Sequence, residues 1–156
     1  MAHISRAHAS FRIGGDRFTE PPGALPDPRA VTARLGIQPT YLHNPGERRS
    51  ASAAPYKHGQ WRLESPLAES EVLEVHLRWL LDRLLAVREG VLEIVQTDRR
   101  LSADFFCGLF LKQGNEGLVL SPRTLEEMSA LNAELDLDIY WIGSDSNDPP
   151  GGGSKA

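Results

Sequence analysis

The feature that most constrains the fold is the switching between two hydrophobic periods along the chain. Four segments alternate apolar and polar residues, as half-buried β-strands do. These segments cover about residues 7–13, 56–64, 101–111 and 135–141. After the second of them, leucines recur every three or four residues from Leu73 to Leu84, which predicts a long amphipathic helix at about residues 69–88. A chain of this kind must bury a helix face against a sheet face.

Two shorter helices are marked by the residues at their ends. Asp27 can cap a helix, a proline follows it, and Gly36 can adopt the left-handed conformation that ends one. Ser121 is also followed by proline, and Asn132 can end the helix that starts there. Residues 90–97 fit a helix, which we favour, although their β-branched residues leave a strand open.

The predicted order is strand, helix, two strands, helix, two strands, helix, strand. We expect "QGNEG" (113–117) to reverse the chain into a short strand at 118–120, forming a hairpin with the long strand. Such links favour an α+β two-layer sandwich, with a mainly antiparallel sheet of five to six strands and helices packed on one face, over a parallel doubly wound sheet.

We expect a single α+β domain over residues 6–143. Residues 16–26 are rich in proline and predict a loop, and the polar segment 144–156 predicts a disordered tail. Trp61 is expected at the centre of the core. Its expected neighbours are Phe11, Leu63, Leu77, Leu80, Phe105 and Ile139.

Charge and cysteine content limit the possible functions. The formal net charge is -4, whereas a general nucleic-acid binder carries a basic excess, so we expect no nucleic-acid partner. Cys107 is the single cysteine, which excludes an intramolecular disulfide and fits a reducing compartment. No apolar run is long enough for a signal peptide or a membrane span. We therefore expect a cytoplasmic protein without a membrane partner.

The familiar catalytic motifs are missing from the sequence. There is no phosphate loop, dinucleotide fingerprint, zinc-protease motif, nucleophile elbow or calcium loop. Asp136 and Asp138 would project from one strand face, but no third metal ligand accompanies them. Cys107 falls on the apolar phase of its strand and is interpreted as a buried hydrophobe. We predict no catalytic residue, no cofactor and no metal.

The best candidate for a binding surface surrounds "YKHGQWRLES" at residues 56–65. Its alternation predicts two faces. One holds Lys57, Gly59, Trp61 and Leu63, and the other holds Tyr56, His58, Gln60, Arg62 and Glu64. His43, on the preceding extended segment, would lie nearby if the two segments pair. Imidazole and guanidinium groups together suit a phosphate or carboxylate, with an ordinary solvated face as the alternative. The candidate binding residues are Arg48, Arg49, Tyr56, His58 and Arg62.

Phe106 and Phe110 fall on the polar phase of their strand. Because helices cover one face of a two-layer domain, both rings are expected on the other face, beside the segment 56–64. Aromatic residues beside histidine and arginine are typical of an interface, so we predict both as interface residues. The partner would be another protein or a second copy of the chain, as a homodimer about a two-fold axis. An uninvolved wet face and a ligand site remain alternatives.

Several stretches together resemble a known family. They are "DPRAVTARLGIQPT", "HGQWRLES", "LEVHLRWLLDRL" and "GLVLSPRTLEEMSALNAELDLDIY". In this order the chain resembles, over about residues 9–142, the bacterial family catalogued as domain of unknown function 4279. Asn132 stands where glycine is expected, and both residues tolerate the left-handed conformation. The resemblance implies a small bacterial domain and brings no established activity.

The function that these patterns favour is a non-enzymatic protein-interaction or binding module. The alternative is a small-molecule or anion-binding domain, or an enzyme of unfamiliar type.

Overall fold

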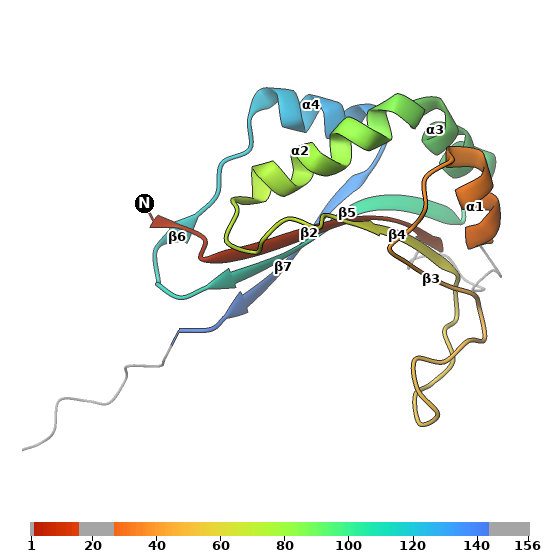
Figure 1. Cartoon of the computed structure of the whole chain (residues 1–156), viewed down its shortest axis with the longest axis horizontal. Helices are drawn as coiled ribbons and strands as arrows, with labels where there is room; N and C mark the ends of the chain where they lie inside the picture. The colour runs from red at the N-terminus through yellow and green to blue at the C-terminus, as the bar shows by residue number, and fades with distance from the viewer. Residues whose placement is uncertain (1, 16–26, 144–156) are drawn as a thin grey trace, which may run out of the picture.

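The computed structural model describes residues 2–15 and 27–143. The predicted loop at 16–26 and the predicted tail at 144–156 lie outside the described residues. In the described part, a five-stranded sheet forms one layer and the helices cover one of its faces (Figure 1). This arrangement confirms the predicted α+β class with a mainly antiparallel sheet.

The large sheet has β2 (Arg6–Gly15), the earliest of its strands in the sequence, in the middle. Its order is β3 (Tyr41–His43), β4 (Gln60–Glu64), β2, β5 (Leu101–Leu111) and β7 (Glu134–Trp141). Neighbouring strands run antiparallel, except β5 and β7, which run parallel. A small second sheet pairs β1 (Ala2–His3) with β6 (Glu116–Gly117) in parallel.

The helices lie on one side of the large sheet (Figure 1). They are α1 (Pro28–Leu35), α2 (Leu73–Leu84), α3 (Arg88–Thr97) and α4 (Pro122–Ala130), with a short 3-10 helix at Leu85–Val87. Residues 90–97 are therefore helical, and the long helix begins at Leu73 rather than at residue 69. Helix α4 belongs to the crossover connection that the parallel β5–β7 pair requires.

The predicted helix ends are confirmed. The Asp27 side chain accepts a hydrogen bond from the Arg29 amide, and Gly36 ends α1 with a φ of 67°. The Ser121 side chain caps α4 by accepting from the Thr124 amide, and Asn132 has a φ of 51°. Local chemistry therefore sets these boundaries, because each cap satisfies a backbone group that the helix leaves unpaired.

The predicted hairpin after β5 is wrong. Both edges of β5 are occupied, by β2 on one side and by β7 on the other, so the segment 118–120 has no edge to join. Instead Glu116 closes a turn by accepting from the amides of Lys112 and Gln113, and β6 pairs with β1. Leu118 and Leu120 then pack against the core as the chain rises to α4.

The core forms between the sheet and the helices. Trp61 is fully buried, as predicted, and its Nε1 donates a hydrogen bond to Thr32 Oγ1 at 3.1 Å. The expected neighbours Phe11, Leu63, Leu77, Leu80 and Phe105 are also buried. The prediction for Ile139 is wrong, because this side chain is 60% exposed. It lies on the helix side of β7, but β7 is an edge strand that runs out from under the helices (Figure 1).

Candidate functional site

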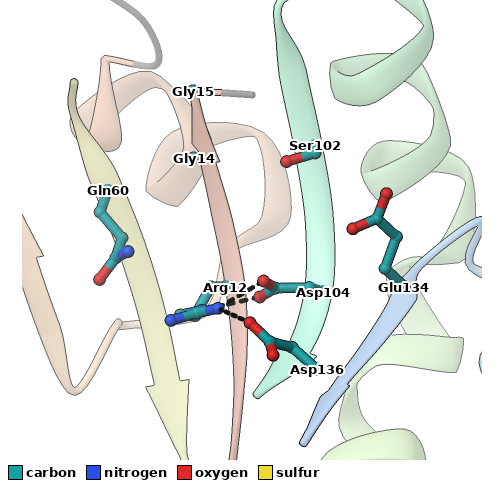
Figure 2. Close-up of a pocket in the computed structure, with 8 residues that line it drawn as sticks. All are labelled: Arg12, Gly14, Gly15, Gln60, Ser102, Asp104, Glu134 and Asp136. Carbon is teal, nitrogen blue, oxygen red and sulfur yellow. Dashed lines mark hydrogen bonds and ion pairs between the residues drawn. The ribbon is translucent and has the colours of Figure 1, made fainter. Parts of the chain in front are cut away.

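The sheet face opposite the helices is polar, and an ion-pair network crosses its centre. Arg12 on β2 donates from Nε to Asp104 Oδ1 at 2.8 Å and from Nη2 to Asp104 Oδ2 at 2.5 Å. The same Nη2 donates to Asp136 Oδ2 at 3.2 Å, so one guanidinium ties β2 to β5 and β7 (Figure 2). Its plane also lies 4.2 Å from the centre of the Phe106 ring.

Partial burial of the network makes its charges interdependent. The Arg12 side chain is 18% exposed, and those of Asp104 and Asp136 are 14% and 24% exposed. Burial acts to lower the pKa of Arg12, but the hydrogen bonds and negative charges of the two carboxylates outweigh it, and the net effect raises that pKa. The network is thus a permanent charged cross-link between strands, and Arg12 is already engaged by protein carboxylates.

A first hollow lies beside this network. It measures about 260 Å³ (Figure 2). Its lining consists of Arg12, Gly14, Gly15, Gln60, Ser102, Asp104, Glu134 and Asp136. Among the described residues of this lining, three carboxylates and one guanidinium give the hollow an acidic character.

A second hollow, called the Tyr56 hollow below, adjoins the first and has the opposite character. It measures about 340 Å³. Its lining consists of Gly14, Gly15, Tyr41, His43, Tyr56, Lys57, His58, Gly59, Gln60 and Arg62. None of these residues is acidic, whereas Lys57 and Arg62 are cationic. A chain of net negative charge therefore presents a locally basic pocket.

Stacked rings form one wall of the Tyr56 hollow. The rings of His43 and Tyr56 are stacked, with centres 3.7 Å apart and planes 14° from parallel. The hydroxyls of Tyr41 and Tyr56 lie 3.1 Å apart, within hydrogen-bonding distance. Backbone bonds from Tyr56 N to Glu47 O and from Gly46 N to Tyr56 O, both 2.8 Å, hold Tyr56 against the start of its loop.

The position of His58 depends on a glycine. A Cβ atom at Gly15 would lie only 2.5 Å from His58 Nδ1, so the missing side chain makes room for the imidazole. Burial lowers the pKa of His43, so this ring is neutral at pH 7. Arg62 donates from Nη2 to Gln60 Oε1 at 3.0 Å and from Nη1 to Glu64 Oε1 at 3.3 Å.

Several nitrogens at this site are buried without a hydrogen-bond partner among residues 2–15 and 27–143. They are Nδ1 of His43, Nδ1 of His58 and Nε of Arg62. Buried polar atoms are nearly always paired, so three such nitrogens on residues of one hollow are unusual.

The structure brings together three of the five predicted binding residues. Tyr56, His58 and Arg62 line one hollow. Arg48 does not line it, and its Nη1 instead donates to Ala53 O at 2.8 Å within the loop. Arg49 is exposed and also outside the lining, although its charge reaches Tyr41. The pKa of Tyr41 is raised chiefly by its hydrogen bond to Tyr56, against the opposing charges of Arg62 and Arg49.

The predicted interface residues lie on the polar face and are half-buried. Phe106 lies beneath Arg12, and Phe110 stacks on Tyr140 with ring centres 5.1 Å apart. The Arg6 guanidinium lies 4.3 Å from the centre of the Phe110 ring. The His8 ring contacts both phenylalanines, with centres 6.3 and 5.8 Å away. These contacts make one aromatic and arginine cluster on the polar face.

Sequence reasoning missed Arg12, Asp104 and Lys57. Arg12 and Asp104 lie on the polar phases of their strands, which is a usable signal, but their pairing depends on strands about 90 residues apart being neighbours. Lys57 was placed on the opposite face because strict alternation was extended through residues 56–59, which precede β4. The loop geometry there does not follow the strand period.

Two tests for other site types are negative within residues 2–15 and 27–143. No group of three or more His, Cys, Asp or Glu side chains is arranged to hold a metal ion. None of the helices there combines the length and the apolar character needed to cross a bilayer.

Comparison with known proteins places the chain in a family. No curated protein and no solved structure matches it. The model of the family described as "Domain of unknown function (DUF4279)" matches residues 5–141, which is most of the chain and agrees with the resemblance seen in the sequence. The chain therefore belongs to the DUF4279 family.

Proposed function

We propose that the protein is a non-enzymatic binding module of the bacterial cytoplasm, and that its Tyr56 hollow binds the phosphate or carboxylate group of a small molecule. The proposal is carried by buried nitrogens of His43, His58 and Arg62 that have no hydrogen-bond partner among the described residues, in a pocket whose described lining contains no acidic residue. A bound anion would accept hydrogen bonds from donors of this kind.

The charge around the hollow supports an anionic ligand. Lys57 and Arg62 line it, and Arg49 lies close enough to act on Tyr41. The tyrosine hydroxyls add neutral donors, and the flat ring of Tyr56 offers apolar surface to the body of a ligand. The adjoining acidic hollow is separated from these groups by Gln60 and the backbone of Gly14 and Gly15, which line both.

Two candidate nucleophiles in the described part of the chain, Cys107 and Ser65, are not activated. Burial raises the pKa of the Cys107 thiol to about 12, so its thiolate is not available at neutral pH. Ser65 Oγ lies 3.0 Å from His76 Nδ1, but that ring is fully buried. Its Nε2 has no hydrogen-bond partner among the described residues, so the carboxylate that orients a catalytic histidine is missing from this pair.

Titration with inorganic phosphate and with acetate, followed by NMR of the amide and aromatic signals, tests the proposal. Saturable shifts at Tyr41, Tyr56 and His58 are expected, with sodium chloride at equal ionic strength as the reference. Arg62→Gln should weaken binding at least about tenfold, as expected for losing one charge-assisted hydrogen bond. Arg48→Gln is the matched control, because Arg48 lies in the same loop region outside the hollow, and it should leave the affinity unchanged.

Two results would contradict an anion site. One is the lack of saturable shifts with either anion. The other is equal weakening by Arg62→Gln and Arg48→Gln, which would indicate diffuse charge attraction. A thermal-shift screen of phosphorylated and carboxylated metabolites then identifies the ligand, since a ligand at 100 times its Kd adds about 2.7 kcal/mol of stability.

A protein partner is the second candidate, and the cluster around Phe110 favours it. Tyrosine, phenylalanine and arginine are enriched at interfaces, and Tyr140 in this cluster is 45% exposed. The partner would be another protein or a second copy of the chain that covers the polar face. Sedimentation of the wild type and of a Phe106→Glu, Phe110→Glu double variant tests the second copy, and two monomers would exclude a homodimer through this face.

A further inference from the structure

The edge strand β7 pairs with β5 on one side and, among the described residues, has no partner strand on the other. All of its residues from Glu134 to Trp141 pair with β5. Ile142 N donates to Leu111 O at 2.8 Å, which shows that the even-numbered residues of β7 are the ones whose backbone groups bond to β5. In a parallel pair alternate residues bond to the neighbour, so the N–H and C=O groups of Leu135, Leu137, Ile139 and Trp141 point to the open edge.

The same four residues form an apolar row on the helix side of β7. Their side chains are exposed by 39% at Leu135, 39% at Leu137, 60% at Ile139 and 51% at Trp141. Monomeric proteins usually protect an edge with a very short strand, charged side chains, a proline or a bulge. The opposite edge strand β3 has three residues, whereas β7 has eight and contains neither proline nor lysine. Its charged residues Glu134, Asp136 and Asp138 all lie on the polar side of the strand and leave the apolar side without a charge. The unpaired backbone and the apolar row therefore coincide on one strand.

We propose that two copies of the chain pair antiparallel through their β7 edges, about a two-fold axis at Ile139. This register places Ile139 opposite its copy and Leu137 opposite Trp141 on the apolar side. On the polar side it places Asp138 opposite Tyr140. Tyr140 already donates a hydrogen bond to Asp138 within one chain, so the two groups are complementary. The two five-stranded sheets then form one continuous sheet with both helix layers on the same side.

Charge disfavours the two neighbouring registers with an axis at Asp138 or at Leu137. An axis at Asp138 would set that carboxylate opposite its own copy, and an axis at Leu137 would set Asp136 opposite Asp138. Directly opposed like charges destabilise a strand pair. The chain segment that follows, residues 144–156, contains no aromatic or branched aliphatic residue, so its composition does not suit the apolar row. A second copy supplies both the apolar surface and the missing backbone partners.

Sedimentation equilibrium of the full chain tests the pairing with a charge swap at the axis. Ile139→Lys and Ile139→Glu should each sediment as a monomer, because each would bring two like charges together. An equimolar mixture of the two should recover the dimer, because lysine then faces glutamate. Val119→Lys is the matched control, since Val119 is also an exposed apolar residue, at 65%, and belongs to the segment between β6 and α4 rather than to β7. It should dimerise like the wild type.

The variants at Ile139 distinguish pairing through β7 from association through the polar face. A wild type that stays monomeric up to millimolar concentration overturns the proposal, and so does a dimer that survives Ile139→Lys. Failure of the mixed lysine and glutamate variants to associate overturns the two-fold axis at Ile139. Thermal unfolding of each variant verifies that it is folded, which the exposure of the Ile139 side chain leads us to expect.

Discussion

Replacing Trp61 by alanine should destabilise the protein more than most single substitutions. The side chain is fully buried, faces the helix layer from β4, and donates its indole N–H to Thr32 Oγ1 on α1. Removing a buried tryptophan side chain costs about 3–5 kcal/mol through lost transfer energy and the cavity left behind. Thr32 Oγ1 also bonds to Pro28 O at 3.0 Å, so its hydroxyl keeps a partner and the lost hydrogen bond adds little.

The measurement is urea unfolding followed by far-ultraviolet circular dichroism, because the substitution removes a fluorophore. Domains of this size have unfolding free energies of about 5–15 kcal/mol, so Trp61→Ala should lower the midpoint strongly with little change in slope. Trp61→Phe keeps most of the apolar volume but removes the donor, and we expect it to cost about 1–2 kcal/mol. A Trp61→Ala variant that loses less than about 1 kcal/mol would refute the assignment of this residue to the core.

Three further predictions concern buried titratable groups. Cys107 should not react with a thiol reagent at neutral pH in the native state, because burial raises its pKa to about 12. It should react once urea unfolds the chain. Rapid labelling of the native protein would contradict this prediction. Burial lowers the pKa of His76 and of His43, so both rings are neutral in the native state at pH 7. The stability that these neutral rings contribute is fully present above the unfolded pKa of about 6.5. It is lost as the pH falls from there through the folded pKa. Thermal unfolding between pH 7.5 and 5 should show this loss, with a shallower slope in His76→Asn. Asp104→Asn should lower the free energy of unfolding by about 1.5–3 kcal/mol, the range for a hydrogen bond to a charged group. If the same substitution has no effect in an Arg12→Gln background, the pairing of Arg12 with Asp104 is the cause.

The elements of the fold were predictable because their signals are local. Alternation marks β2, β4, β5 and β7, and the caps at Asp27 and Ser121 mark α1 and α4 through the backbone groups that they satisfy. Alternation also separated the two faces of the sheet correctly in β4, where Trp61 is buried and Arg62 faces the polar side.

Strand order was not predictable in the same way, and the errors follow from it. Periodicity shows which face a residue occupies but not whether its strand is central or at an edge, so Ile139 was assigned to the core. The turn at 113–117 has the composition of a hairpin, but distant strands occupy both edges of β5. Arg12 and Asp104 could not be paired for the same reason.

The candidate site was predictable in part. His58 and Arg62 share a hollow because they lie on the same face, with Arg62 in the middle of β4 and His58 two residues before its start. Arg48 and Arg49 were included because they are close in sequence, and the path of an irregular loop does not follow from such proximity. The unpartnered nitrogens at the site depend on three-dimensional burial, which no sequence pattern reports.

The central place of β2 has a consequence for how the protein is made. This strand leaves the ribosome before its neighbours, yet its partner on one side, β5, ends at Leu111. A nascent chain that has emerged only as far as α3 can pair β2 with β4 but leaves the other edge of β2 open. Contacts so distant in sequence slow folding, and the open edge is exposed to association with other nascent chains. The sheet is completed only after β5 and then β7 have been synthesised, so we expect the domain to finish folding only once β7 has emerged.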